Sequence, residues 1–514
     1  MGVIIRQSIK GTIVNYIGSF IGFLMTFFIM MRFLSAEEIG LTNVLLNAAL
    51  LFAGLAQLGT NSSTMRFYPY FKDETKKDHG FFFWTLLVPF IGFFIVLFFF
   101  LLFREPITRF FAENSQLFVE YYNYVIPLAF FLLYISVFET NSNVLLRIVI
   151  PKFIREIVIR LLLIVVYLLY AFRVLDLTGF VTAFCTVYGA AMILNLIYLF
   201  SLKRVSLKPD LAHISKPLKK DFTFYTIFLV TAALGGTITP MINSFFLSAK
   251  MGLAYTGVFT VATYIATIVE IPYRSLGAIT RPHISQSVKE NDIPATNTLC
   301  KSVSLHQLLA GIFIFYFIWI NIDIIFEILP NGQIYSAGKW AVFFIGMSRL
   351  FNSVVSIGTT VLSYSRYYYF SLIFTFMLTA MAIGFNLLLI PVWGITGAAI
   401  ASLASYVIYF TLLLSLIRWK VGTSIFSMNQ LKILAIVIIL FILNWLWEKS
   451  LGPLIIQLPI QSFYAHIINR LLCSIVMAIL AFTAVYKMNI SPQVNSLVDK
   501  YWKKFSNGIR KRKN

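Results

Sequence analysis

The chain has 514 residues, of which 59% are hydrophobic and only 12% are charged, and its mean hydropathy is +0.84. Soluble domains carry charge on about a quarter of their residues, so a soluble protein of this composition could not cover its surface with polar side chains. The net charge of +21 does not indicate nucleic-acid binding, because the chain has no basic folded domain outside its apolar stretches. The composition predicts an all-α integral membrane protein built from apolar spans of about 20 residues.

Fourteen apolar stretches of suitable length follow one another along the chain. The first comes after Arg6 and Lys10 and is longer than the apolar core of a cleaved signal peptide, so we expect it to remain as the first helix. The predicted transmembrane helices cover residues 11–34, 41–63, 81–103, 118–141, 157–175, 179–201, 222–247, 253–275, 305–328, 338–362, 367–390, 394–417, 429–448 and 463–486. The longest polar stretches between them, near 202–221 and 276–304, leave no room for a soluble catalytic domain.

The distribution of basic residues predicts the orientation. An even number of spans places both termini on one side, and by our count about 32 of the 41 Lys and Arg residues fall on that side. Since loops rich in Lys and Arg stay in the cytoplasm, we expect both termini to be cytoplasmic. The positive net charge then follows from this topology and from attraction to anionic lipid headgroups.

An internal repeat relates two halves of the chain. With an offset of about 218 residues the matched positions are Gly18 with Gly236, Arg32 with Lys250, Ala36 with Ala254, Leu177–Gly179 with Ile395–Gly397, Tyr188 with Tyr406 and, after a one-residue gap, Gly40 with Gly257. Six helices in each repeat is an even number, so both repeats have the same topology and are parallel. Parallel repeats that rock about a shared central site favour a transporter that works by alternating access.

The repeat divides the chain into five parts. These are an N-lobe at 1–201, a cytoplasmic linker at 202–221, a C-lobe at 222–417, two additional helices within 418–487 and a basic cytoplasmic tail at 488–514.

Polar side chains recur at helical spacing on three of the predicted helices. Arg349, Asn352 and Ser356 share one face of the helix at 338–362. A charged side chain at membrane depth costs roughly 2.5–3.5 kcal/mol, and Arg349 lies near the middle of its span. We therefore expect this face to border a wet cavity, although Ser and Thr hydroxyls also bond to their own backbone where helices simply pack closely.

The other two polar faces leave more than one interpretation open. Glu270 and Arg274 end a threonine stripe on the helix at 253–275, and they form either a local ion pair or part of the cavity. Gln57 lies on the polar face of the helix at 41–63. Arg66 and Arg281 lie near cytoplasmic ends, where they are topology anchors or contacts to a ligand.

Signatures of enzymes and metal sites are missing from the sequence. It contains no H-E-x-x-H motif and no C-x-x-C pair, and its three cysteines are far apart. Residues 332–339, GQIYSAGK, have the wrong spacing for a phosphate-binding loop. We expect no catalytic residue, no metal ion and no cofactor.

Two segments resemble a known family. Residues 386–406, NLLLIPVWGITGAAIASLASY, resemble the hairpin of helices 11 and 12 in the polysaccharide-transport (Wzx-type) oligosaccharide flippases, with matches at Asn386, Pro391, Gly394 and Gly397. Residues 32–40, RFLSAEEIG, resemble the family's turn between helices 1 and 2. These flippases share a superfamily, the multidrug and toxic-compound, oligosaccharidyl-lipid and polysaccharide exporters, whose members have two six-helix lobes.

The resemblance implies a function. Such a flippase moves undecaprenyl-pyrophosphate-linked oligosaccharide across the bacterial cytoplasmic membrane for surface polysaccharides, of which the O-antigen of lipopolysaccharide is one. It implies a monomeric transporter in the lipid bilayer, with polymerases and glycosyltransferases as candidate partners. The basic cavity typical of the family would correspond here, as a hypothesis, to Arg349, Arg274, Arg66 and Arg281.

Alternatives stay open at this point. Residues 66–74, RFYPYFKDE, lack the Arg-x-x-Ala-Glu-Gly run of the lipid II flippases, which argues against lipid II as the substrate. A multidrug or small-solute/cation antiporter of the same superfamily is the main alternative, but buried acids for ion coupling are few: Glu139, Glu270 and, unless it is exposed at the outer end of its helix, Asp323. A glycan polymerase or ligase is a third, although such enzymes carry a long outer loop and the longest one here lies near 104–118.

Overall fold

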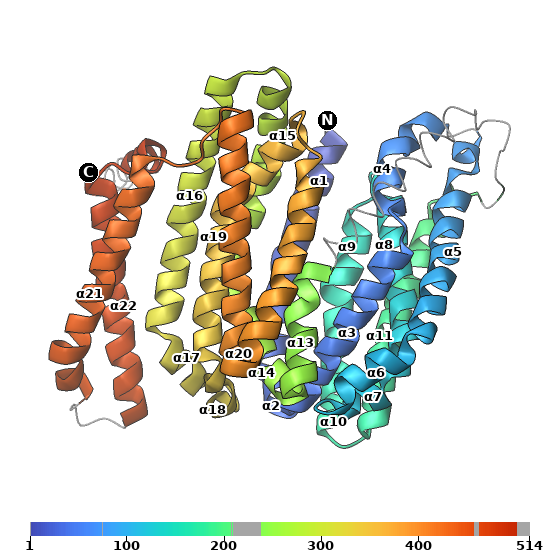
Figure 1. Cartoon of the computed structure of the whole chain (residues 1–514), viewed down its shortest axis with the longest axis horizontal. Helices are drawn as coiled ribbons and strands as arrows, with labels where there is room; N and C mark the ends of the chain where they lie inside the picture. The colour runs from blue at the N-terminus through green and yellow to red at the C-terminus, as the bar shows by residue number, and fades with distance from the viewer. Residues whose placement is uncertain (1, 74–75, 207, 209–237, 457–461, 501–514) are drawn as a thin grey trace, which may run out of the picture. The chain divides into compact units, whose positions relative to one another are not determined.

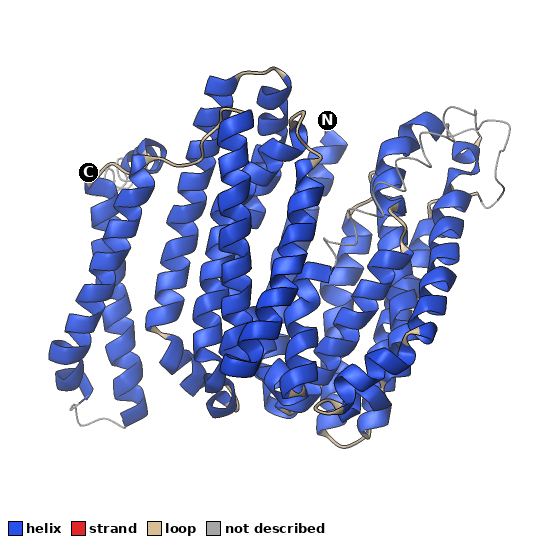
Figure 2. Ribbon diagram, in the orientation of Figure 1, coloured by secondary structure: helices blue, strands red, loops and turns tan. Residues whose placement is uncertain are grey.

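The computed structural model describes residues 2–73, 76–206, 208, 238–456 and 462–500 (Figure 1). All regular structure in these ranges is helical, and no strand occurs among them (Figure 2). Eleven helices in this part of the chain are long and apolar enough to cross a membrane.

The helices of the N-terminal half include several short and π-helical segments. Their bounds are α1 Gly2–Leu24, η1 Met25–Met30, α2 Met31–Phe33, α3 Ala36–Ala56, α4 Thr60–Phe71, η2 Lys77–Gly80, α5 Phe81–Leu102, α6 Arg104–Ala112, α7 Gln116–Glu120, η3 Tyr122–Tyr124, α8 Val125–Val144, α9 Val149–Phe153, η4 Ile154–Val158, α10 Ile159–Ala171 and α11 Leu177–Ser201.

The C-terminal half contains the longest helices. Their bounds are η6 Thr239–Met241, α13 Ile242–Met251, α14 Leu253–Thr267, η7 Ile268–Glu270, α15 Ile271–Lys289, α16 Ile293–Ile320, α17 Ile322–Ile328, α18 Gly332–Tyr335, η8 Ser336–Gly338, α19 Lys339–Tyr364, α20 Phe370–Lys420, α21 Met428–Ile456 and α22 Ser462–Lys487.

The predicted all-α membrane fold is confirmed. The difference between the eleven spans of the structure and the fourteen predicted from the sequence arises at three places. The 51-residue α20 contains two predicted spans, joined at a kink where Gly394 has φ 53° and ψ −125°. The predicted span at 157–175 falls on the helical stretch 149–171, which carries four charged residues. The predicted span at 222–247 lies mostly outside the described residues.

The chain separates into two compact units. The first comprises residues 1–261, 329–338 and 375–401, and the second comprises residues 262–328, 339–374 and 402–514.

The sequence predicts that the polar stretch at 276–304 connects two helices as a loop, and this prediction of its secondary structure is wrong. Helix α15 continues to Lys289 and α16 begins at Ile293. The Asp292 carboxylate caps α16 by accepting a hydrogen bond from the Ala295 N–H at 2.9 Å, as Asp does at many helix starts. Loss of apolar character marks where a helix leaves the membrane, and the helix itself continues beyond that point.

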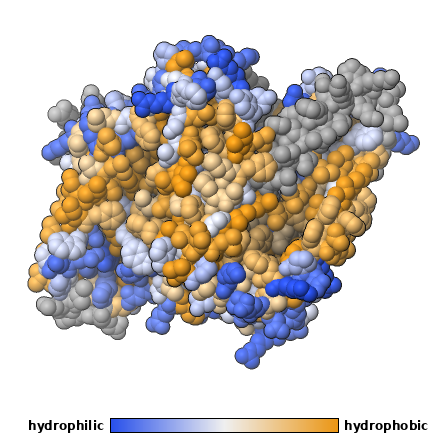
Figure 3. All heavy atoms as spheres, in the orientation of Figure 1, coloured by the Kyte–Doolittle hydropathy of each residue, from blue (hydrophilic) through white to orange (hydrophobic). Residues whose placement is uncertain are grey.

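Apolar side chains cover the middle lengths of the helices, and polar side chains gather near their ends (Figure 3). Phe98 on α5 is 62% exposed and Leu388 on α20 is 67% exposed. Large exposed apolar surfaces are rare on soluble proteins. Here the hydrocarbon of the bilayer is the solvent that such side chains face.

The segment RFLSAEEIG at residues 32–40 has a structural explanation inside the first unit. The Ser35 and Glu38 side chains form a capping box that starts α3, with the Ser35 N–H donating to Glu38 Oε2 at 2.7 Å. Glu38 also accepts a hydrogen bond from the Tyr170 hydroxyl. The serine and the glutamate of this motif therefore fix the position at which α3 begins.

Gly40, the last residue of that segment, packs directly on the start of α14. A Cβ atom on Gly40 would lie 1.9 Å from the Leu253 carbonyl oxygen, and one on Gly257 would lie 1.9 Å from the Ala36 carbonyl oxygen. Each glycine and its counterpart, and each carbonyl and its counterpart, are separated by 217 residues in the sequence. The two halves of this contact thus repeat one another, and they include the pairing of Gly40 with Gly257 found in the sequence.

A buried ion pair holds the turn between α4 and α5 in the first unit. Asp78 is completely buried and accepts hydrogen bonds from Arg204 Nη2 at 3.1 Å and from the Asp73 N–H at 3.0 Å. Removing one partner of a buried pair costs roughly 3–5 kcal/mol. We expect Asp78→Ala to lower the melting temperature of the purified protein clearly.

The matched control for Asp78→Ala is Asp323→Ala. Asp323 pairs with Lys339 at 2.6 Å, but its side chain is 66% exposed, and exposed pairs contribute roughly 0.2–1 kcal/mol. Equal melting temperatures for the two variants would contradict a structural role for the buried pair.

Candidate functional site

Three polar side chains meet inside the second unit. Arg349 Nη1 lies 3.4 Å from Glu270 Oε1, and Asn352 Nδ2 donates to the same oxygen at 3.1 Å. Arg349 and Asn352 are one turn apart on α19, so their side chains share a face. The structure therefore brings together three of the residues that the sequence places in a wet cavity.

A break in the helix positions Glu270. The 3₁₀ turn η7 ends at Glu270 and separates α14 from α15, and Pro272 follows in the first turn of α15. Proline lacks an N–H and its ring clashes with the preceding turn, which disfavours a continuous α-helix here. On the neighbouring α16, a Cβ at Gly311 would lie 2.9 Å from Leu350 Cδ1, so this glycine lets α16 pack closely against α19.

Among the described residues, the geometry leaves most of the Arg349 donors available to bind something else. A guanidinium has five N–H donors, and only one makes the long 3.4 Å contact with Glu270. The Arg349 side chain is 29% exposed, whereas that of Glu270 is 7% exposed. A partly open arginine held by one weak contact can form paired hydrogen bonds with the oxygens of a phosphate or pyrophosphate.

The remaining predicted site residues have different surroundings. Ser356 is buried and donates to the Ser353 carbonyl at 3.1 Å. It therefore bonds to the backbone of its own helix, as hydroxyls do where helices pack closely. In the first unit, Gln57 is the C-cap of α3, and Arg66 on α4 is exposed with its guanidinium 5.5 Å from the Phe67 ring centroid. The side chains of Arg274 and Arg281 lie outside the described residues. Their place in a cavity stays a prediction.

The four residues matched in the family hairpin lie on α20 of the first unit. Asn386 Nδ2 donates to Asn243 Oδ1 on α13 at 2.9 Å, so it links two helices. Pro391 lies inside α20 ahead of the kink, and Gly394 has a positive φ that favours glycine. A Cβ on Gly397 would lie 2.1 Å from the Leu389 carbonyl oxygen. These contacts give the motif a structural explanation.

A second charged cluster, in the first unit, was not predicted. Arg155 on the π-helical segment η4 bonds Glu139 at 2.9 Å and Glu156 at 3.2 Å, and Arg160 bonds Glu156 at 2.9 Å. A Cβ on Gly18 of α1 would lie 2.7 Å from Glu156 Cβ. The sequence does carry a signal for this cluster, because Glu156 and Arg160 are spaced i, i+4 at the start of the predicted span at 157–175.

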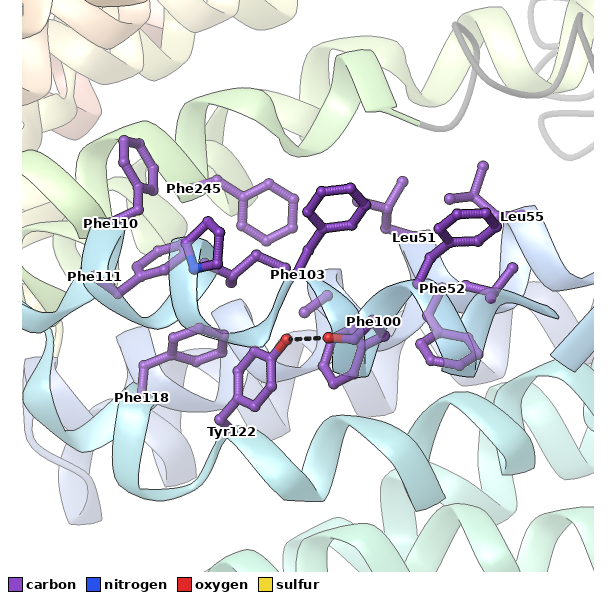
Figure 4. A pocket seen from close by; sticks show the side chains of 15 residues that line it. Leu51, Phe52, Leu55, Phe100, Phe103, Phe110, Phe111, Phe118, Tyr122 and Phe245 are labelled. Atoms are coloured by element: carbon purple, nitrogen blue, oxygen red, sulfur yellow. Dashed lines mark hydrogen bonds between the residues drawn. The ribbon is translucent and has the colours of Figure 1, made fainter. Parts of the chain in front are cut away.

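The first unit also contains an apolar cavity of about 660 Å³ between α3, α5, α6 and α13 (Figure 4). Rings of Phe52, Phe103, Phe111 and Phe245 line it, and the hydroxyl of Tyr122 donates to the Phe100 carbonyl. None of the described residues that line the cavity is charged, so it suits hydrocarbon and not a sugar or a phosphate.

No group of three or more His, Cys, Asp and Glu side chains within the described ranges is arranged to hold a metal ion. The cysteines at 185, 300 and 473 are free and buried.

Comparison with known proteins gives one family and one fold. The sequence model of a family described as polysaccharide biosynthesis protein matches residues 6–288. No curated protein matches the sequence.

Solved structures share the fold at low sequence identity. The lipid II flippase MurJ in an inward closed conformation has a TM-score of 0.72 and 13% identity, over 94% of this chain and 100% of that one. An inward-facing multidrug resistance MATE family transporter has a TM-score of 0.59 and 16% identity, over 77% of this chain and 92% of that one. A MOP superfamily transporter from Pyrococcus furiosus has a TM-score of 0.53 and 15% identity, over 82% and 95%. The chain thus has the fold of these transporters.

Proposed function

Because this chain belongs to the polysaccharide biosynthesis protein family, we propose that it is a flippase for lipid-linked oligosaccharide. Its substrate would be an oligosaccharide on undecaprenyl pyrophosphate, moved by alternating access from the cytoplasmic to the outer leaflet of the bacterial cytoplasmic membrane. The observation that carries this proposal is the partly open Arg349 beside Glu270 and Asn352 within the membrane helices of the second unit.

The physical problem that such a protein solves is the passage of a polar head group. Sugar hydroxyls lose their hydrogen bonds in hydrocarbon, at a cost of several kcal/mol for each unpaired group. Amide side chains such as that of Asn352 replace water for the hydroxyls, and the Arg349 guanidinium pairs with the pyrophosphate. The lipid tail stays in the bilayer throughout, so the protein has to shelter only the head group.

The solved structures support a lipid-linked substrate over a small solute. Similarity to the lipid II flippase extends over 94% of this chain, whereas that to the inward-facing multidrug transporter extends over 77%. The absent Arg-x-x-Ala-Glu-Gly run after the second predicted helix favours an oligosaccharide other than the lipid II head group. On this proposal the protein binds and moves its substrate without breaking a covalent bond.

Deletion of the gene tests the proposal. We expect lipid-linked oligosaccharide to accumulate in the cytoplasmic leaflet and the surface polysaccharide to disappear, measured by extraction of the lipid-linked pool and by staining of surface polymer. Complementation with the full chain should restore both. Normal surface polysaccharide together with new sensitivity to drugs would instead identify a multidrug antiporter.

A further inference from the structure

A polar cavity of about 510 Å³ lies at one end of the second unit. None of the residues that line it belongs to the cluster of Arg349, Asn352 and Glu270. It is bordered by the end of α15, the start of α16, the turn after α19 and the end of α20. The distribution of Lys and Arg predicts that this end faces the cytoplasm. Nothing in the proposed transport step uses this cavity.

Three basic side chains border the cavity: Lys289, Arg366 and Lys420. Within the described part of the chain none of the three forms an ion pair. The Arg366 guanidinium lies 5.0 Å from the Tyr367 ring centroid, and Lys420 Nζ lies 3.7 Å from that of Trp419. Three cations around one hollow without a counter-charge from the described residues attract an anion.

The nearby carboxylates are already engaged elsewhere. Glu290 Oε1 accepts a hydrogen bond from Gln286 Nε2 at 2.9 Å, and Asp292 Oδ1 accepts one from the Ala295 N–H at 2.9 Å. Neither carboxylate belongs to the residues that line the cavity. The local charge of the cavity wall is therefore positive.

A buried hydroxyl provides a second, independent observation. Thr423 borders the cavity and is 2% exposed, and its Oγ1 atom has no hydrogen-bond partner among the described residues. Buried polar groups are nearly always paired. Asn297 holds this segment in place, accepting from the Ser424 N–H at 2.7 Å, so the threonine is fixed beside the cavity with its hydrogen bonding unsatisfied.

Exposed aromatic side chains surround the same end of the unit. Tyr364 borders the cavity and is 48% exposed, and Trp419, whose ring contacts the cavity residue Lys420, is 76% exposed. Tyrosine and tryptophan collect at the level of the lipid headgroups in membrane proteins. The cavity therefore lies where the phosphates of a bilayer are available.

We propose that this cavity binds a phosphate group, supplied either by the headgroup of an anionic phospholipid or by a soluble phosphate ester. Lys and Arg side chains bind phosphate oxygens through charge-assisted hydrogen bonds, and the Thr423 hydroxyl adds a neutral donor. The site is separate from the proposed flippase function, because the proposed transport step uses none of the residues that line this cavity. Binding at the site can therefore be measured without transport.

The test measures binding to purified full-length protein in a neutral detergent. Short-chain phosphatidylglycerol, short-chain phosphatidylcholine and inorganic pyrophosphate are titrated separately, and binding is followed by native mass spectrometry and by the melting temperature. The wild type is compared with the triple variant K289Q/R366Q/K420Q, with Thr423→Val and with Arg418→Gln. Arg418 is the matched control, because it is an exposed arginine on the last turns of α20 that does not line the cavity.

We expect phosphatidylglycerol to bind the wild type and Arg418→Gln alike, about tenfold or more weakly to the triple variant, and several-fold more weakly to Thr423→Val. Binding of phosphatidylglycerol without pyrophosphate identifies a lipid headgroup, and competition by pyrophosphate identifies a soluble ester. Equal binding by the wild type and the triple variant, or an equal loss in Arg418→Gln, would overturn the proposal. If the triple variant does not fold, the single variants Arg366→Gln and Lys420→Gln decide in the same way.

Discussion

Arg349→Ala is expected to abolish transport while the folded protein still reaches the membrane. The variant removes the partly open guanidinium that we assign to the pyrophosphate, and it leaves the Glu270 carboxylate buried beside Asn352. Loss of a charge-assisted paired contact to a pyrophosphate should reduce transport at least a hundredfold, since such hydrogen bonds are worth about 1.5–3 kcal/mol each. Complementation of the deletion strain and the amount of protein in the membrane are measured together.

A double variant separates ligand binding from charge balance. If Arg349 serves only to neutralise Glu270, then R349A/E270Q should restore transport, because the buried carboxylate is then absent. If Arg349 binds the substrate, the double variant stays inactive. Arg470→Ala is the matched control, since Arg470 also pairs with a glutamate, Glu448, at 2.7 Å inside the second unit. Its transport should stay close to that of the wild type.

Gly40→Ala and Gly257→Ala form the second pair of variants with a large expected effect. Each new Cβ would lie 1.9 Å from a backbone carbonyl oxygen of the facing helix. A side chain could move aside, but a carbonyl inside a helix can move only if the helix moves. We expect each variant to lose about 1–3 kcal/mol or more of stability, as overpacked contacts do, and to lose transport.

Gly384→Ala is the control for these two variants. A Cβ at Gly384 of α20 would have no heavy atom within 4 Å, so alanine there should leave the melting temperature and transport unchanged. Because Gly40 and Gly257 are equivalent in the repeat, their alanine variants should have closely similar effects. Normal melting temperature and transport in either variant would show that the close contact between α3 and α14 is not required.

Several features of the fold could be predicted from the sequence because they depend on local composition. The bilayer demands apolar helices of a fixed length, so most spans are visible as apolar stretches. The repeat pairs Gly40 with Gly257 in the sequence, and the structure shows that each of these glycines packs against the backbone of the other's helix. The spacing of Arg349 and Asn352 places both on one face of a helix, which is where the structure has them.

Other features depend on tertiary contacts that no local pattern reports. The position of Glu270 beside Arg349 needs the packing of η7 and α15 against α19, whereas the sequence left open whether Glu270 forms a local pair with Arg274 or faces the cavity. The cluster of Glu139, Arg155 and Glu156 joins residues from separate helices. Helix ends were also missed, as at Lys289, because hydropathy reports membrane depth and says little about polar turns beyond it.

The central claim, that the chain moves a lipid-linked oligosaccharide between leaflets, is tested most directly in reconstituted vesicles. Purified wild-type protein and Arg349→Ala are placed in liposomes that contain undecaprenyl-pyrophosphate-linked oligosaccharide, and the fraction of glycan accessible to an added glycan-cleaving enzyme is followed over time. We predict rapid transfer of the protected glycan to the accessible leaflet with the wild type and no transfer above that of empty liposomes with Arg349→Ala. A wild-type rate equal to that of empty liposomes would contradict the account.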